Sequence, residues 1–438
     1  MKKTKTPAAA AASSVDDHLW REHLDELITR IRPHFTRAEP ARNAGALILG
    51  LMSDVESKNC WTLAEHCGHN TPDRLQHLLS RAKWDDTKVM ADVRDMAVEA
   101  FGADDAILVV DETGDLKKGT ATVGVQRQYT GTAGRIENSQ VAVCMTYAGT
   151  GGHTLIDRAL YLPESWATDP DRRQRAGIPD EIEFATKPAL AAAMIIRAID
   201  AGVPAAWVAG DEVYGADPGL RDTLEQRQIG YVLGIGCNRT IMAETGPSRV
   251  DDLVKALPAG SWHTLSAGTG AKGERWYKWA QINTLDEPCQ GRCSVLARLN
   301  NATGELAYYR CYSPGPVTLA ELVRVAGRRW TVEESFQTSK GVTGLDQHQV
   351  RTWTSWHRWT VLVFLAHAFL AVMTAHTRNA DTTGDQRIRL SLKEFRRLFI
   401  ALLLAPLHHD RTHILTWSHW RRKHQLIAQR CHQKARSK

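Results

Sequence analysis

The stretch "AILVVDETGDLKKG", residues 106–119, places five apolar residues directly before two carboxylates. A short apolar run bounded by turn residues is typical of a buried β-strand, so we expect Ile107–Val110 to lie inside a sheet. Asp111 then stands at or just past the carboxyl end of that strand, where ligand and metal sites collect in open α/β sheets. Asp111 and Glu112 could equally be solvated turn residues, because turns favour aspartate.

A second apolar run ends on a carboxylate in the same way. "PAAWVAGDEVYG", residues 204–215, predicts a strand that leads into Asp211. Between the two runs, 140–147 and 154–162 are expected to pair as a hairpin across the glycine-rich "AGTGG", and 187–202 is expected to form a helix. The alternation of strands and helices over 101–237 predicts an α/β core.

The flanking regions have different patterns. Residues 1–15 are expected to be a disordered arm, and 16–100 a helical domain whose segment 62–84 is either a DNA-binding helix–turn–helix or part of a plain bundle. Residues 238–316 predict a β-rich insertion, 317–380 a return to core helices, and 381–438 a basic helical C-terminal region. The apolar run 360–373 is too short to span a bilayer and predicts a buried core helix.

Composition narrows the class of protein. The chain has 438 residues and a net charge of +6, which is compatible with nucleic-acid binding. From Arg411 onward there is no acidic residue, so the end of the chain is a candidate phosphate-binding arm or a solubilising tail. The eight cysteines lack the paired spacing of a zinc site, so we expect no structural zinc and a reducing, cytoplasmic environment.

A late helical segment supplies the third carboxylate. Residues 318–341 predict a helix on which Glu333 shares a face with Arg329 and Lys340. That trio alone could be a surface ion-pair stripe. Together with Asp111 and Asp211, however, Glu333 predicts a shared divalent-metal site, because Mg²⁺ prefers carboxylate oxygens. A ribonuclease-H-like sheet would bring such side chains together.

Four blocks of the sequence resemble the DDE transposases of bacterial insertion sequences, most closely the insertion sequence seven-hundred-one family. They are "VVDETGDLKKG", "VGVQRQYTGTAGRIENSQVAV", "AGDEVYG" and "GRRWTVEESFQTSKGVTGLDQHQVRTWTSWHRW". Arg329, Glu333 and Lys340 fit the group's Y-x2-R-x3-E-x6-K signature, except that Ala326 stands where tyrosine is expected. Similarity runs from about residue 35 to the closing "WSHWRRKHQLIAQRCH".

The resemblance implies an α/β fold with a ribonuclease-H-like catalytic core and a Mg²⁺-dependent transposase, for which Mn²⁺ can substitute. Asp111, Asp211 and Glu333 would be the catalytic metal ligands, with Glu334 as the adjacent rival. The enzyme would nick transposon ends and then transfer the freed strand into target DNA. Its implied partners are double-stranded DNA, at terminal inverted repeats and target, and a second copy of the chain. Its implied location is the bacterial nucleoid in the cytoplasm, with no membrane.

Other side chains are candidate DNA contacts. Phosphate binding requires cations near the metal, and aromatic rings can stack on unpaired bases. Trp353, Trp356 and Trp359 form an aromatic cluster, in which Trp353 and Trp356, three residues apart, could equally pack against the core. Trp330 is expected to lie in the core because it neighbours the ligand helix. Two alternative functions stay open, a DNA-binding descendant that no longer cuts and a nuclease without strand transfer. The candidate DNA contacts are Arg329, Lys340, Lys117, Lys118, Arg127, Arg135, Arg351 and Trp353.

Overall fold

The computed structural model describes residues 16–244, 246–270, 273–285, 290–380 and 390–404, together with residues 417, 420 and 427. The chain divides into two compact units: Arg94–Gln337, and Met1–Val93 with Thr338–Lys438. The expected arm 1–15, most of the basic end and the segment 381–389 lie outside the described residues. The expected 317–380 region is divided between the two units at Thr338.

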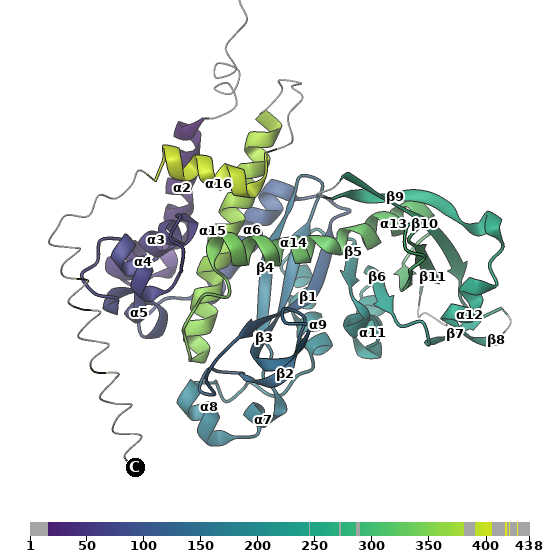
Figure 1. Ribbon diagram of the computed structural model, residues 1–438, viewed down its shortest axis with the longest axis horizontal. Helices are drawn as coiled ribbons and strands as arrows, with labels where there is room; N and C mark the ends of the chain where they lie inside the picture. Colours follow the sequence, from purple (N-terminus) through teal and green to yellow (C-terminus); the bar gives the residue numbers. More distant parts are fainter. Residues whose placement is uncertain are drawn as a thin grey trace, which may run out of the picture. The chain divides into compact units, whose positions relative to one another are not determined.

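The unit Arg94–Gln337 is built on one large sheet with strand order β2-β3-β1-β5-β6-β12-β11-β10-β9, in which β4 also pairs with β3 (Figure 1). Its first strands are β1 (Ile107–Leu116), β2 (Gln126–Thr130), β3 (Arg135–Ala148) and β4 (His153–Leu160). The next two are β5 (Trp207–Gly210) and β6 (Gly230–Ile235). β3 runs antiparallel to β1 and β4, whereas β5 runs parallel to β1 and to β6. The expected hairpin of 140–147 with 154–162 is confirmed by the pairing of β3 with β4.

The first strand is longer than the sequence predicts. β1 continues through Asp111 to Leu116, because its pairing with β3 runs unbroken from Ile107↔Ala148 to Leu116↔Ser139. The expectation that Asp111 ends the strand is therefore wrong. On the other side of β1 the pairing with β5 stops at Val109↔Ala209, so Asp111 lies beside the end of β5.

The β-rich region 238–316 extends this sheet. Its main strands are β9 (His263–Gly270), β10 (Gly273–Asn283), β11 (Arg292–Leu299) and β12 (Leu306–Ser313), and β12 pairs antiparallel with β6. We expected an insertion separate from the α/β core, but that antiparallel pairing continues the core sheet. β7 (Thr240–Ala243) and β8 (Gly246–Arg249) form a separate pair. The short helices α12 (Val250–Lys255) and η2 (Ala259–Ser261) follow β8.

Helices cover the sheet. α9 (Lys187–Asp200) packs on β1, β3 and β4, and α13 (Leu319–Arg328) packs on β1, β5 and β6. Thr318 caps α13 through its hydroxyl, as the sequence predicts. The other helices of this unit are α7 (Glu164–Ala167), α8 (Pro170–Ala176), α10 (Glu212–Gly215), α11 (Pro218–Gln226) and α14 (Trp330–Thr338), whose last residue lies beyond the division.

The other unit is helical in its described residues. α15 (Trp353–Ala380) is the one described helix long and apolar enough to cross a membrane by length and composition, and 83% of its most apolar window is buried inside the protein. It packs on α3 and α5, so the predicted core helix is present. The remaining elements are α2 (Asp17–Ile31), η1 (Arg32–His34), α3 (Ala38–Met52), α4 (Cys60–His66), α5 (Asp73–Ser80), η3 (Ser339–Thr343) and α16 (Leu392–Leu402), with α6 (Asp86–Phe101) crossing the division.

Candidate active site

Strand register brings the two predicted aspartates to matching positions. β1 and β5 pair in parallel as Ile107↔Trp207 and Val109↔Ala209, so Asp111 and Asp211 both stand two residues beyond the last pair. Asp111 stays in its strand, and its Oδ1 accepts a hydrogen bond of 2.8 Å from the Glu112 amide. Asp211 caps α10, and its Oδ1 accepts one of 2.9 Å from the Val213 amide. The sheet thus places two carboxylates at one edge.

These carboxylates are energetically costly to ionise. Burial raises the pKa of Asp111 from 3.8 to about 7, and the negative charges of Asp211 and Glu112 add to the rise while Arg329 opposes it. Burial and the Glu112 charge likewise raise the pKa of Asp211. A cation bound between them would relieve both effects.

Arg329 connects the third predicted carboxylate to this edge. One of its guanidinium nitrogens lies 2.7 Å from Oε1 of Glu333, one helical turn further along, and another lies 3.7 Å from Oδ2 of Asp111. Burial lowers the pKa of Arg329, but the charges of Glu333 and Asp111 outweigh that effect and raise it. The guanidinium therefore bridges the two carboxylates as a fixed positive charge.

Glu334, the adjacent rival, makes a different contact. Its Oε2 lies 3.6 Å from Nε2 of His153, the first residue of β4. Trp330, on the same helix, is 46% exposed, so its expected place in the core is wrong. Of the two neighbouring glutamates, only Glu333 shares a partner with Asp111 among the contacts that the structure describes.

Sequence reasoning missed a fourth carboxylate and its partners. Glu112 accepts a hydrogen bond of 2.6 Å from Nζ of Lys187, at the start of α9, and one of 3.0 Å from the hydroxyl of Tyr214, in α10. Side chains alternate across a strand, so Asp111 and Glu112 leave β1 on opposite faces, toward α14 and toward α9. A sequence signal did exist, since Tyr214 follows Asp211 within "DEVYG".

The donor set suits a hard cation. All the candidate ligands are carboxylates, and Asp111, Glu112, Asp211 and Glu333 face two cations, Arg329 and Lys187. Among the described residues, no three His, Cys, Asp or Glu side chains are close enough together to share one metal ion. Asp111 and Glu333 meet through the guanidinium instead. The residues therefore fit a divalent ion by chemistry and charge, and their side chains would have to move closer together to ligate one.

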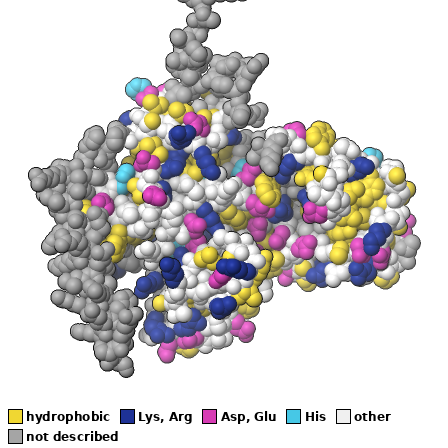
Figure 2. All heavy atoms as spheres, in the orientation of Figure 1, with side chains coloured by type: hydrophobic (Ala, Val, Ile, Leu, Met, Phe, Trp, Pro, Cys, Tyr) yellow, Lys and Arg dark blue, Asp and Glu magenta, His cyan; other side chains and the backbone are white. Residues whose placement is uncertain are grey.

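The predicted DNA contacts fall into two groups. Lys117, Lys118, Arg127 and Arg135 belong to the same unit as the aspartates, and Figure 2 shows Lys and Arg side chains around β2 and α8. Lys117 lies 3.4 Å from Asp115, Arg135 lies 2.9 Å from Glu137, and Arg127 is exposed. Lys340, Arg351 and Trp353 belong to the other unit.

The three tryptophans Trp353, Trp356 and Trp359 differ in burial. Trp356 and Trp359 are buried, so they pack in the core rather than being available to stack on a base. Trp353 is half-buried, and its ring lies 4.5 Å from that of His357. Only Trp353 of the three therefore keeps a surface that DNA could reach.

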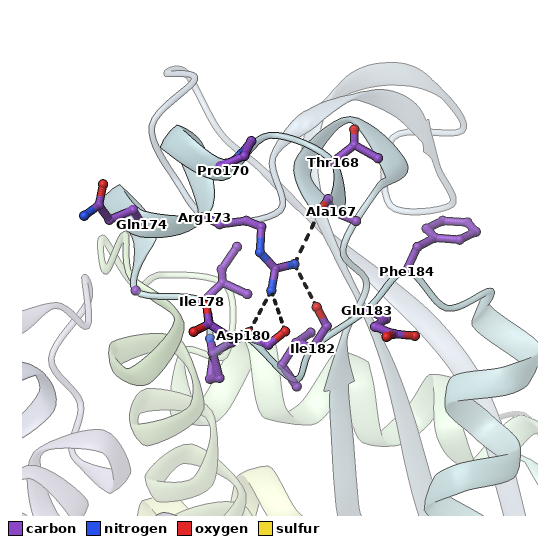
Figure 3. Close-up of a pocket in the computed structure, with 12 residues that line it drawn as sticks. Ala167, Thr168, Pro170, Arg173, Gln174, Ile178, Asp180, Ile182, Glu183 and Phe184 are labelled. Atoms are coloured by element: carbon purple, nitrogen blue, oxygen red, sulfur yellow. Dashed lines mark hydrogen bonds between the residues drawn. The ribbon is translucent and has the colours of Figure 1, made fainter.

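A large cavity lies apart from these carboxylates. It is next to α8, has a volume of about 920 Å³, and is lined by none of the predicted site residues (Figure 3). Arg173 donates hydrogen bonds there to the carbonyls of Ile182 at 2.7 Å and Pro179 at 2.8 Å. Its guanidinium thus holds a loop in place, and the cavity is not the candidate active site.

Comparison with known proteins agrees with this geometry. A family model described as "DDE superfamily endonuclease" matches residues 30–279. The chain belongs to the DDE superfamily endonucleases. The match includes Asp111 and Asp211 and ends before Glu333.

Two individual proteins are similar to this DDE endonuclease. A "Probable transposase for insertion sequence element IS701" from Microchaete diplosiphon is 28% identical over 196 residues, which are 44% of this chain and 49% of the relative. The chain thus spans about half the length of that relative, and the expected resemblance to this family is confirmed. A piggyBac transposase solved in a synaptic complex with hairpin DNA is 14% identical, with a TM-score of 0.41 over 92% of this chain and 84% of that one.

Proposed function

We propose that this DDE endonuclease is a DNA transposase that cuts the ends of an insertion sequence and joins them to target DNA, using Mg²⁺. One observation carries the proposal: Asp111 and Asp211 both stand two residues beyond the last pair of β1 with β5, and Arg329 links Asp111 to Glu333. The name of the relative, a probable insertion-sequence transposase, agrees with it.

We propose a ribonuclease-H-like core for the catalytic unit. Its support is the strand order β4-β3-β1-β5-β6, with three antiparallel strands followed by two that run parallel to the first. In this arrangement the parallel strands β5 and β6 end at one edge, beyond which β1 continues. The aspartates after β5 and within β1 lie at that edge.

Asp111, Asp211 and Glu333 are the metal ligands in this proposal. Two bound Mg²⁺ ions would activate the attacking water and stabilise the leaving oxygen of the phosphodiester. Asp111 comes from strand β1, Asp211 from the N-cap of α10 directly after β5, and Glu333 from α14. Arg329 holds Glu333 and Asp111 together and supplies a positive charge next to the scissile phosphate.

DNA contacts follow from the placement of cations. Lys117, Lys118, Arg127 and Arg135 neutralise phosphates beside the first aspartate in this proposal. Lys340, Arg351 and Trp353 contact DNA from the other unit. The working enzyme is a homodimer on paired ends in the bacterial cytoplasm.

Cleavage of a labelled duplex that carries the terminal inverted repeat tests the proposal. Asp111→Asn, Asp211→Asn and Glu333→Gln should abolish Mg²⁺-dependent cleavage while keeping the gel shift, because an amide is a poorer Mg²⁺ ligand than a carboxylate. Glu334→Gln is the matched control and should still cut. Cleavage by Glu333→Gln, together with inactivity of Glu334→Gln, would show that the ligand is misassigned.

A second assay separates the alternatives. Donor and target plasmids should yield joined products with the wild-type chain. Cleavage without joining would indicate a nuclease of the same fold, and binding without cleavage in Mg²⁺ would indicate a descendant that only binds DNA.

A further inference from the structure

The pairing of β2 with the start of β3 forms a two-stranded ribbon. β1 pairs with β3 only as far as Ser139, and β4 pairs only with Ala142–Ala148 of that strand. Residues 135–138 of β3 therefore pair with β2 alone among the described strands. We call residues 126–139 the ribbon.

One face of the ribbon is anchored. Thr130 is buried against β1, where a Cβ atom on Gly114 would overlap its side chain. The hydroxyl of Thr132, in the ribbon's turn, donates a hydrogen bond of 2.9 Å to the Gly114 carbonyl. The tip is thereby fixed to the strand that carries Asp111.

The other face displays an apolar pair. Tyr129 and Ile136 stand directly opposite each other across the two strands, and they are 61% and 57% exposed. Directly opposite residues share a face of the pair. Arg127, two residues before Tyr129, points to the same side and is exposed. Arg135 stands opposite Thr130, so it belongs to the anchored face, where it pairs with Glu137 at 2.9 Å. Two adjacent exposed apolar side chains beside an arginine form a surface suited to a polyanion with apolar features.

Double-stranded DNA fits this surface better than a protein partner does. The major groove of B-DNA is about 12 Å wide and admits a two-stranded β-ribbon, whose strands are about 4.8 Å apart. Thymine methyl groups accept apolar contact there, base edges accept a tyrosine hydroxyl, and the flanking phosphates pair with arginine.

The ribbon also lies at a useful distance from the carboxylates. Ile136 precedes Cys144, the strand partner of Asp111, by eight residues, so it is at most about 27 Å away along β3. That length corresponds to about eight base pairs.

We propose that the apolar pair Tyr129–Ile136 contacts base edges in the major groove, within about eight base pairs of the bond that is cut, while Arg127 on the same face holds an adjacent phosphate. The ribbon then provides sequence recognition of the element's end. This inference rests on the proposed function, since it names the part of the same site that distinguishes an end from other DNA.

Binding measured without cleavage tests the ribbon independently of catalysis. The probe is a duplex carrying the inverted repeat that flanks the gene, compared with a scrambled duplex, in Ca²⁺ or EDTA. The double variant Tyr129→Ser/Ile136→Ser should lose about tenfold in affinity for the end duplex, with no change for the scrambled duplex and no change in salt dependence. Arg127→Gln should weaken binding to both duplexes and reduce the salt slope by about one.

Trp276→Ser is the matched control, because Trp276 is a 57% exposed apolar residue on β10, far from the ribbon in the strand order. Its end affinity should equal that of the wild type. Methylation interference on the end duplex should map ribbon-dependent base contacts within about ten base pairs of the cut. Unchanged end affinity in the Tyr129→Ser/Ile136→Ser variant would overturn the proposal, as would a change only in its oligomeric state. Ribbon-dependent binding without any Mg²⁺-dependent cleavage would reject the proposed catalysis and leave the ribbon assignment standing.

Discussion

Replacing Asp111 by asparagine should stabilise the metal-free protein at alkaline pH. Burial raises the pKa of this carboxyl from 3.8 to about 7, so the folded chain holds its proton more tightly than the unfolded chain does. Between the two pKa values the folded state binds more protons than the unfolded state does, so the free energy of unfolding falls as the pH rises. The difference between the two pKa values, at 1.36 kcal/mol per pH unit, lowers the free energy of unfolding by about 4 kcal/mol above pH 7. Asparagine has no proton to lose and avoids this cost.

Thermal melts in EDTA at a series of pH values between 4 and 8 measure the effect. Near pH 4 the wild type and Asp111→Asn should melt together, and at pH 8 the variant should melt about 10 °C higher, since a unit of this size gains about 2–4 °C per kcal/mol. Asp222→Asn, at an exposed carboxylate on α11, is the control and should follow the wild type. Adding Mg²⁺ at pH 8 should stabilise the wild type more than Asp111→Asn, because the ion needs the carboxylate.

Parallel pH profiles for the wild type and Asp111→Asn in EDTA would refute the reasoning. They would mean that Asp111 ionises in the folded chain as easily as in the unfolded one. The burial and the nearby charges of Asp211 and Glu112 would then not set its protonation.

Three further substitutions follow from contacts in the structure. Tyr214→Phe removes a hydroxyl that donates to Glu112 at 3.0 Å, and it should cost about 1.5–3 kcal/mol in chemical denaturation and weaken Mg²⁺ binding measured by calorimetry. Gly215→Ala should cost about 1–3 kcal/mol, because its Cβ would overlap the Gly234 carbonyl, and it should lower the rate of end cleavage by displacing the cap residue of the same helix. Arg358→Met removes bonds to two backbone carbonyls and a ring contact of 5.0 Å in the helical unit, so it should lower the melting temperature without changing cleavage by folded protein.

Local pattern was enough to predict the elements that hold the site. Apolar runs gave β1 and β5, and helical spacing gave the shared face of Arg329 and Glu333, which the structure joins at 2.7 Å. The end of β1 was missed because Thr113, Gly114 and Asp115 are polar or small and resemble a turn. Pairing with β3 on one side keeps them extended, and that pairing partner lies more than twenty residues away in the sequence.

Tertiary contacts could not be predicted in the same way. The role of Glu112 depends on Lys187 and Tyr214, which come from two helices that are 75 and 102 residues away in the sequence. A strand exposes successive side chains on opposite faces, so adjacent carboxylates inevitably meet different neighbours. Sequence spacing alone therefore does not show that Asp111 is the candidate metal ligand and Glu112 a residue that contacts the supporting helices.

The signature Arg329-x3-Glu333-x6-Lys340 contains one contact that sequence spacing predicts and others that depend on the fold. Arg329 and Glu333 are one helical turn apart, so backbone geometry alone brings them together, and only the contact of Arg329 with Asp111 needs the fold. Lys340 lies in η3, beyond the division between the two compact units. A helix face that is continuous in sequence need not be continuous in structure, because η3 is a π-helix with a different number of residues per turn. The spacing thus supports Glu333 as a partner of Arg329, while it does not by itself place Lys340 at the same phosphate.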